Sequence, residues 1–403
     1  SVRNVRERTF PVRNATGQIY RIAGVAEDIT ERKTQDEKIA RLTRIYAVLS
    51  GINSAIVRIH DRKDLLNEAC RIAVEHGGFE LVLMLKIEPV SMQVTPMSWG
   101  GAAADVEFAK QKMLGPENNV ATQTGTVAQS VRQCRPVYCN DLGKEPEIGL
   151  ARSEMLLRGY RSVISLPLMP GGECFGVMVL YTKEPDVFDD LELRLLTELA
   201  GDISFGLEFI SKEEQAIFLA YHDPLTGHGN RAMLHERMGL FVDEAAREGG
   251  HLALILLDVD RFKTINSTLG RTVGDMLLCQ LAERLAKSTG DPARIARLGS
   301  DQFTVILPGV RDANHAARLV EEQVLSCFNE PFRPNDQELR IGGKVGIALY
   351  PEDGADAETL FHNAEAAVKR AKNSGDRYLF YTQEMTEKVA QNLTLENELR
   401  RAL

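Results

Sequence analysis

The stretch "RLGSDQF", residues 297–303, is the part of this sequence that most constrains the fold of the C-terminal half. It lies between "RIAR" (294–297) and "FTVILP" (303–308), two segments of strand character, and so predicts a β-hairpin with a tight turn. Such a turn can hold an acidic loop over a ligand. Here the loop carries one carboxylate, Asp301, and the next residue is the amide Gln302 instead of a second acid.

Strands and helices alternate around this hairpin. An apolar run, "LALILLDVDRF" at 252–262, indicates a buried strand. Further strands are expected at 339–351 and 378–381, and helices at 273–289, 313–328 and 357–375. This order predicts an α/β sandwich with a central mixed sheet.

The N-terminal half has a different pattern. Its first 26 residues read as a hairpin, and apolar residues then recur at helical spacing through residues 34–56. Strands are expected at 81–88, 92–99, 160–168 and 173–182, followed by a long helix at 189–221. This predicts an α+β sensor domain whose antiparallel sheet is covered on one face. The fold class is therefore a multidomain α+β and α/β protein.

The long helix has a possible heptad seam. Leu196, Leu199, Ile203, Ile210 and Ile217 fit a and d positions, which favours a parallel two-helix coil, although the same stripe could pack on its own domain. We expect a homodimer held by the helices at 34–56 and 191–220.

Composition excludes several function classes. The net charge of −9 argues against a nucleic-acid partner, which needs a basic surface. Apolar runs are too short to span a membrane in this fragment. Six scattered cysteines fit a reducing, cytoplasmic setting, and Cys134 and Cys139 lack the further ligands of a metal site. His60 and His76 are candidates for haem ligands, but a lone histidine is more often an ordinary surface or core residue with its polar atoms satisfied. Trp99 is expected in the core or a pocket wall.

Candidate chemistry gathers at the end of the 252–262 strand. Asp258 and Asp260 follow buried residues, and paired acids at a strand end suit Mg²⁺ completed by phosphate and water. Lys263 and Lys372 could bind phosphate, and Asn266 and Asp275 could contact a base edge. Any one of these residues, taken alone, is better explained as an ordinary solvated residue at the start of a helix.

These motifs, taken in order, resemble the GGDEF domains, which condense two GTP into cyclic di-GMP. The resemblance covers residues 213–382 and rests on "DPLTGHGNR", "LDVDRFKTIN", "GRTVGD", "RLGSDQF" and "AEAAVKRAKNSG". Residues 45–210 resemble a GAF domain, and residues 1–33, ending in "DITERK", resemble the tail of a PAS domain. Residues 383–403 resemble the connector that leads into EAL domains, the phosphodiesterases of cyclic di-GMP.

The resemblance implies roles position by position. It assigns Mg²⁺ to Asp258 and the carbonyl of Val259, and GTP to Lys263, Asn266, Asp275 and Lys372. The signature residues are Gly299, Ser300, Asp301, Gln302 and Phe303, so a glycine is replaced by serine and a metal-binding glutamate by glutamine.

Three further departures weaken the resemblance to an active enzyme. Asp376 stands where the family often has arginine, and an acid there opposes a triphosphate. Gly290 and Ala293 replace the Arg and Asp of the inhibitory site. The signature is therefore expected to be degenerate, with no intact catalytic set.

Three functions remain open. The first is a GGDEF module that binds GTP or transmits dimer geometry without turnover, regulated by the GAF domain and regulating a C-terminal phosphodiesterase. The second is a low-activity diguanylate cyclase. The third is a protein-interaction scaffold that binds no nucleotide.

Overall fold

The chain folds into two compact units, residues 1–213 and 214–403. The structure is a computed structural model that describes residues 3–13, 17, 19–113, 119–145 and 152–383. The expected connector at 383–403 therefore lies almost entirely outside the described residues. Within the described part of the chain, every helix is too short or too polar to cross a lipid bilayer.

The N-terminal hairpin is confirmed. Strand β1 (Val5–Arg13) pairs antiparallel with β2 (Ile19–Asp28), and helix α1 (Thr30–Arg58) follows. The Asp28 carboxylate accepts a hydrogen bond from the Thr30 backbone N–H at 3.0 Å, which closes the turn between strand and helix. The assignment of residues 1–33 to a PAS domain stays a prediction.

The sensor unit contains a five-stranded antiparallel sheet in the order β4-β3-β7-β6-β5. Its strands are β3 (Leu81–Ile87), β4 (Val94–Gly101), β5 (Val137–Cys139), β6 (Ser162–Leu168) and β7 (Gly176–Thr182). The helices around it, besides α1, are α2 (Arg62–Glu75), α3 (Ala103–Met113), α4 (Thr126–Gln133), α5 (Arg152–Leu157) and α6 (Asp190–Tyr221).

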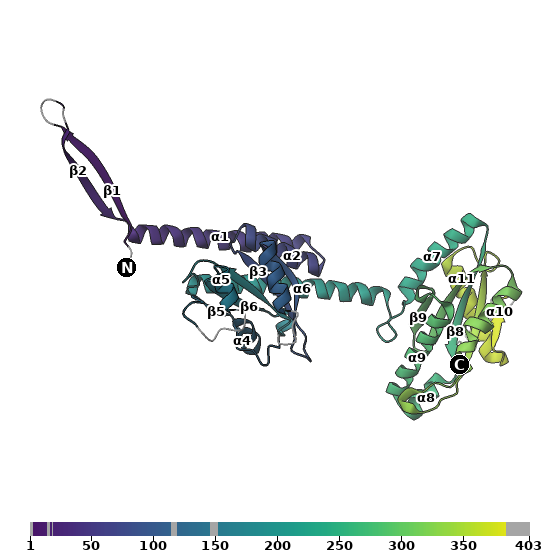
Figure 1. The fold of residues 1–403 in the computed structure, drawn as a ribbon. Coiled ribbons are helices and arrows are strands. Elements are labelled where there is room, and N and C mark those ends of the chain that lie inside the picture. The colour runs from purple at the N-terminus through teal and green to yellow at the C-terminus, as the bar shows by residue number, and fades with distance from the viewer. Residues whose placement is uncertain (1–2, 14–16, 18, 114–118, 146–151, 384–403) are drawn as a thin grey trace, which may run out of the picture. The chain divides into compact units, whose positions relative to one another are not determined.

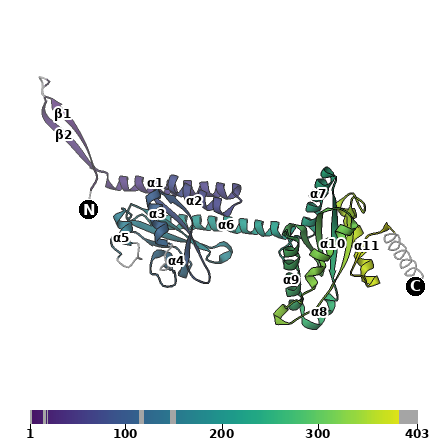
Figure 2. The same ribbon diagram turned by 45° about the vertical axis from the view of Figure 1, so that its right-hand side comes forward.

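Helices cover both faces of this sheet, so the expectation of one covered face is wrong. Residues of α1, α2 and α6 form one apolar cluster with the sheet, and residues of α3 and α4 belong to a second cluster on the other side. Figure 2 shows α1 and α4 on different sides of the strands. The continuous apolar sequences of β3, β6 and β7 explain this, because a sheet with one wet face would alternate polar and apolar residues.

The proposed heptad seam is also wrong for most of its length. Leu196, Leu199, Ile203 and Ile210 are at most 1% exposed and lie in the unit's own core. The apolar stripe of α6 that was expected to contact a partner helix packs instead on the sheet of its own unit. The exposed apolar side chains of α6 in this stretch are instead Phe205 and Phe209, at 64% and 48% exposed.

The C-terminal unit has the expected mixed sheet, in the order β12-β11-β8-β10-β9. Figure 1 labels β8 and β9 among its strands. Only β12 runs parallel to its neighbour. The strands are β8 (His251–Val259), β9 (Ile295–Gly299), β10 (Gln302–Val310), β11 (Gly343–Tyr350) and β12 (Tyr378–Phe380). The helices are α7 (Arg231–Glu248), α8 (Phe262–Leu269), α9 (Arg271–Thr289), α10 (Ala313–Gln323) and α11 (Ala357–Ser374).

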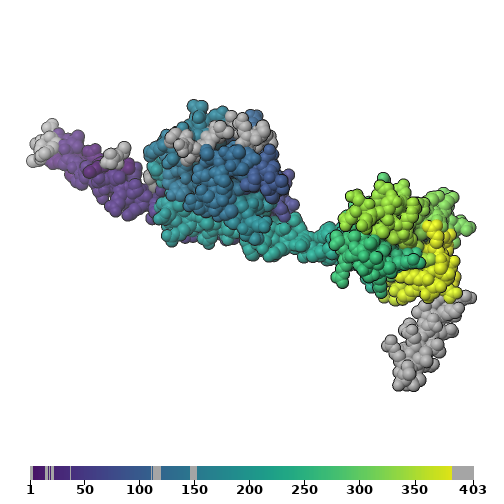
Figure 3. All heavy atoms as spheres, turned by 90° about the horizontal axis from the view of Figure 1, so that it is seen from below, coloured from purple at the N-terminus to yellow at the C-terminus, as the bar shows by residue number. Residues whose placement is uncertain are grey.

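Alternation along β8 divides this unit into two apolar layers. Leu252, Leu254 and Leu256 pack with α7 and α11, whereas Ala253, Ile255 and Leu257 pack with α9 and α10. In the space-filling view the unit is one continuous body of packed side chains, green to yellow in Figure 3. Because side chains alternate across a strand, Asp258 falls on the α11 side.

Helix α11 lies directly on β11. A Cβ at Gly346 would come within 2.2 Å of the Ala364 carbonyl oxygen and 2.4 Å of the Val368 nitrogen. Only glycine allows this approach, which sets the height of α11 above the sheet.

Candidate functional site

Three polar residues form a row across the sheet at the end of β8. Strand register places Gln302 of β10 and Lys344 of β11 on either side of Asp258. Residues opposite one another in antiparallel strands project from the same face, so all three side chains lie on the α11 side. The hairpin predicted from "RLGSDQF" is what brings Gln302 into this row.

The Asp258 carboxylate already has two partners. Its Oδ2 lies 2.5 Å from the Lys372 ammonium of α11 and accepts a hydrogen bond from the Gln302 amide at 3.1 Å. The Asp258 side chain is 5% exposed and that of Lys372 is 43% exposed. The predicted metal ligand and the predicted phosphate ligand therefore satisfy each other in this structure.

Lys344 is a cation at the site that sequence reasoning missed. Its ammonium donates hydrogen bonds to the carbonyl oxygens of Gly375 and Asp376, at 2.7 and 2.9 Å, just beyond the C-terminus of α11. A cation suits this end of a helix dipole. The Asp376 carboxylate itself accepts from the Ser374 hydroxyl at 2.6 Å. No signal in the sequence marks Lys344, because only the strand register of β8 and β11 places it opposite Asp258.

The signature turn keeps an unusual backbone despite the substitution. Gly299 has φ +122° and Ser300 has φ +37°, a left-handed conformation that disfavours residues other than glycine. The Asp301 carbonyl accepts a hydrogen bond from the Val259 N–H at 3.1 Å, which fixes the turn against the end of β8. Phe303 is fully buried beneath it.

Arg297 joins the signature turn to the "DPLTG" turn at 223–227. Its guanidinium donates to both carboxylate oxygens of Asp223 at 2.9 Å and to the Ser300 carbonyl at 2.7 Å. Burial by itself raises the pKa of Asp223, but hydrogen bonds from Thr226 and Arg297 outweigh it and hold the pKa below its usual value. This pair was not identified from the sequence, although Arg297 is the first residue of the quoted stretch.

The predicted base-contacting residues lie on α8 and α9. The Oδ1 atom of Asn266 is buried without a hydrogen-bond partner among the described residues, and it rests against Gly274, where a Cβ would lie 1.9 Å away. An orphaned acceptor of this kind can accept a hydrogen bond from water or from an N–H group of a ligand. Asp275 and Lys263 are exposed and make no side-chain hydrogen bond or ion pair within the described ranges.

Helix α8 also offers an anion site. It begins at Phe262 after Arg261, whose φ is +55°, and no side chain caps it. The first N–H groups of an uncapped helix favour a phosphate.

The donor set fits Mg²⁺ only in part. Asp258 is the one carboxylate in the row, the Val259 carbonyl adjoins it, and Gln302 contributes a neutral amide. No cluster of three or more metal-ligating acid, histidine or cysteine side chains occurs in the part of the chain that is described. Mg²⁺ is commonly held by one or two carboxylates together with substrate phosphates, so one nucleotide-borne ion fits once Lys372 moves away. A two-metal site does not fit these residues.

Other residues named from the sequence have ordinary structural roles. Gly290 terminates α9 with φ +70°, and Ala293 lies in a short 3₁₀ turn. His60 pairs with Glu213 at 2.9 Å on the surface, and His76 follows the last turn of α2. Trp99 is 40% exposed on β4, so of its two expected placements the core is wrong and the pocket wall stays a prediction.

Comparison with known families agrees with these two units. Residues 220–377 match the family described as diguanylate cyclase, GGDEF domain, and residues 59–208 match the GAF domain family. The chain therefore contains a GAF domain followed by a GGDEF domain, and it is related to proteins of cyclic di-GMP signalling.

Several relatives share the C-terminal region. The bifunctional diguanylate cyclase/cyclic di-GMP phosphodiesterase MucR of Pseudomonas aeruginosa is 37% identical over 190 residues, which are 47% of this chain and 27% of MucR. The cyclic di-GMP phosphodiesterase NbdA of the same organism is 33% identical over 46% of this chain and 24% of its own. A solved structure of the TpbB GGDEF domain, also from P. aeruginosa, is 30% identical with a TM-score of 0.39, covering 42% of this chain and 99% of that one. The chain thus spans about a quarter of the length of the first two relatives.

Proposed function

We propose that the C-terminal unit is a GGDEF module that binds a guanine nucleotide without condensing it. The observation that carries this is the Gln302 amide on Asp258 Oδ2, at the place where a second carboxylate would serve as metal ligand and base. An amide cannot take up a proton from an attacking hydroxyl. Loss of general-base assistance alone lowers a rate by about 10²–10⁴-fold.

Three polar features of the unit support the proposed binding. The orphaned Oδ1 of Asn266 can accept from the N–H edge of guanine, and the uncapped start of α8 can accept a phosphate. Lys372 is half exposed and can exchange its ion pair with Asp258 for one with a phosphate, while a nucleotide-borne Mg²⁺ takes the carboxylate. Binding would therefore replace the Lys372 ammonium at Asp258 by the Mg²⁺ that the nucleotide carries.

A slow diguanylate cyclase is the second candidate. The turn at Gly299 and Ser300 has a left-handed backbone, as a glycine-rich signature loop requires, and curated relatives include the diguanylate cyclase TpbB, 34% identical over 154 residues. A scaffold without nucleotide binding remains the third, and it predicts no role for the buried Asn266 acceptor.

In the whole protein, we place this module in cytoplasmic cyclic di-GMP signalling. The GAF domain would sense the input, the helices α1 and α6 would hold a homodimer, and a C-terminal EAL phosphodiesterase would be the output. The bifunctional name of MucR supports the last element. Exposed Phe205 and Phe209 support a helix contact on a different face of α6 from the heptad seam.

Calorimetric titration with GTP and Mg²⁺ tests the proposal. We expect saturable binding that Asn266→Ala weakens by about tenfold, the value of one or two lost hydrogen bonds. Ser267→Ala, the next residue on the same helix, is the matched control and should bind as the wild type does. Absence of heat with the wild type would favour the scaffold instead.

A further inference from the structure

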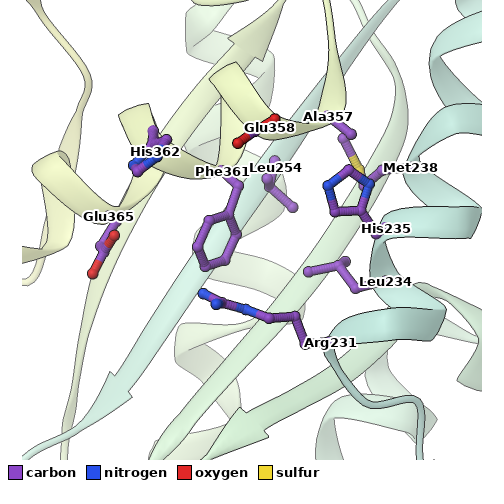
Figure 4. Close-up of a pocket in the computed structure, with 10 residues that line it drawn as sticks. All are labelled: Arg231, Leu234, His235, Met238, Leu254, Ala357, Glu358, Phe361, His362 and Glu365. Carbon is purple, nitrogen blue, oxygen red and sulfur yellow. The ribbon is translucent and has the colours of Figure 1, made fainter. Parts of the chain in front are cut away.

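A cavity lies in the GGDEF unit, between helices α7 and α11. It has a volume of about 400 Å³ and a floor of Leu234, Met238 and Leu254 (Figure 4). These three side chains are at most 5% exposed, so the floor is part of the apolar layer between the sheet and the two helices. Cavities of this size hold small organic ligands.

The cavity is separate from the nucleotide site. Leu254 and Asp258 are four residues apart on β8, about 13 Å at roughly 3.3 Å per residue. Phe361 in the cavity and Lys372 at Asp258 are eleven residues apart on α11, about 16 Å at roughly 1.5 Å per residue. None of the residues assigned to nucleotide or metal lines the cavity.

The α7 wall carries an unpaired positive charge. Arg231 is the first residue of α7, and its guanidinium stacks over the Phe361 ring at 4.8 Å from the centroid. Within the described ranges it has no acidic partner. Stacking on an aromatic ring fixes the plane of a guanidinium and leaves its N–H edge free to bind a carboxylate in bidentate fashion.

The α11 wall carries the opposite charge. Glu358 lies in the first turn of α11, exposed, and makes no ion pair with any described residue. Figure 4 shows Arg231 and Glu358 on opposite sides of the Phe361 ring. Glu365 also lines the cavity, but Lys369 pairs with it at 3.3 Å.

We propose that this cavity binds a small zwitterion with an apolar side chain, of the class of free α-amino acids such as leucine or phenylalanine. The carboxylate pairs with Arg231, the ammonium pairs with Glu358, and the side chain lies on the apolar floor against Phe361. An uncharged apolar ligand would leave both charges unused. A polyanion such as a nucleotide would be repelled by Glu358, the acid of the cavity that has no cationic partner among the described residues.

The test is a calorimetric titration of the full chain with L-leucine and L-phenylalanine. Two derivatives of leucine separate the charges: L-leucinamide lacks the carboxylate, and N-acetyl-L-leucine lacks the ammonium. We expect at least one of the two amino acids to bind, and its amide and N-acetyl derivatives to bind at least about tenfold more weakly. Arg231→Met, which keeps the packing on Phe361, should weaken the amino acid but leave the amide unchanged. Glu358→Gln should likewise weaken binding of the amino acid, but it should leave binding of N-acetyl-L-leucine unchanged.

Arg247→Met, near the other end of α7, is the control for loss of one positive charge and should bind as the wild type does. If neither L-leucine nor L-phenylalanine binds, the proposal is wrong. It is also wrong if the amide and N-acetyl derivatives bind as tightly as the parent amino acid. The derivative series is measured on the wild-type protein, so it decides the question even if Arg231→Met does not fold.

Discussion

Removing the guanidinium of Arg297 should destabilise the GGDEF unit and leave the GAF unit unaffected. The Arg297 side chain is 11% exposed and that of its partner Asp223 is 12% exposed. Arg297→Met removes two hydrogen bonds to Asp223 and one to the Ser300 carbonyl, and it leaves the Asp223 carboxylate buried with only Thr226 as a donor.

The expected loss is about 3 kcal/mol. Removing one partner of a buried ion pair costs roughly 3–5 kcal/mol, and we take the lower end because both side chains keep some solvent contact. With a urea dependence of about 2 kcal/mol per molar, the midpoint of unfolding should fall by about 1.5 M. Arg333→Met is the matched control, because Arg333 and Glu338 pair at 2.7 Å with 67% and 57% exposure. An exposed pair contributes roughly 0–1 kcal/mol.

Two optical signals separate the units in one experiment. The only tryptophan, Trp99, belongs to the GAF unit, so its fluorescence follows that unit. Far-ultraviolet circular dichroism follows both. We expect Arg297→Met to shift the circular dichroism transition of the GGDEF unit and to leave the fluorescence transition where it is.

Acidification should remove the difference in unfolding midpoint between the wild type and Arg297→Met. The folded pKa of Asp223 is lowered, so its stabilising contribution is present above the ordinary pKa of an aspartate and is lost as the pH falls through the folded value. In Arg297→Met the buried carboxylate loses its cation, and protonation relieves the penalty. An unchanged midpoint at neutral pH would refute this account. So would a double variant, Asp223→Asn with Arg297→Met, that is no more stable than Arg297→Met alone.

Four further outcomes are expected. Ser300→Gly should raise the stability of the GGDEF unit by about 1 kcal/mol in urea unfolding, because glycine tolerates φ +37° without strain. Gly274→Ala should weaken GTP binding in calorimetry, because its Cβ would displace the Asn266 amide, 1.9 Å away. Burial raises the pKa of Glu192, so its ionised form disfavours the folded GAF unit. The stability of that unit, followed by Trp99 fluorescence, should therefore be higher at acidic pH and fall as the pH rises through the folded pKa of Glu192. Glu192→Gln should abolish this pH dependence. Phe205→Glu should reduce the dimer fraction in light scattering, because it places charge on an exposed apolar site of α6.

For each of these four predictions, one result would contradict the reasoning. A lower midpoint for Ser300→Gly would mean that the turn depends on the serine side chain. Unchanged GTP affinity in Gly274→Ala would separate Asn266 from the nucleotide. An unaltered pH profile in Glu192→Gln would assign the acid dependence to another group. If the wild-type protein is monomeric at high concentration, the proposed homodimer is wrong, whatever the effect of Phe205→Glu.

Part of this fold was predictable because its signals are local. The "RLGSDQF" hairpin, the apolar β8 strand and the α11 helix each follow from a few neighbouring residues, and the structure confirms them. Two of the wrong expectations, the single covered sheet face and the heptad seam, concern what covers an apolar face. Ile203 fits a heptad and a sheet-covering helix equally well, and only the three-dimensional packing decides between them.

The proximity of the candidate site residues was predictable in the same way, whereas their roles stay predictions. Asp258, Gln302 and Lys372 were expected near one another, and the structure brings them into contact. What the sequence could not give is the ion pair between two predicted ligands, since it depends on the height of α11 above β11. Lys344 and Arg297 were missed because their roles come from strand register and a turn 74 residues away in sequence.

The most direct test of the central claim is the formation of cyclic di-GMP from GTP and Mg²⁺ by the wild type and Gln302→Glu, measured side by side with nucleotide separation by chromatography. If the module binds GTP without condensing it, the wild type should form less than about one thousandth of the product of an active domain, within the loss expected for a missing general base. Gln302→Glu should recover part of that activity, because it restores a carboxylate beside Asp258. Wild-type product above that level, or an equal rate in both proteins, would contradict the account.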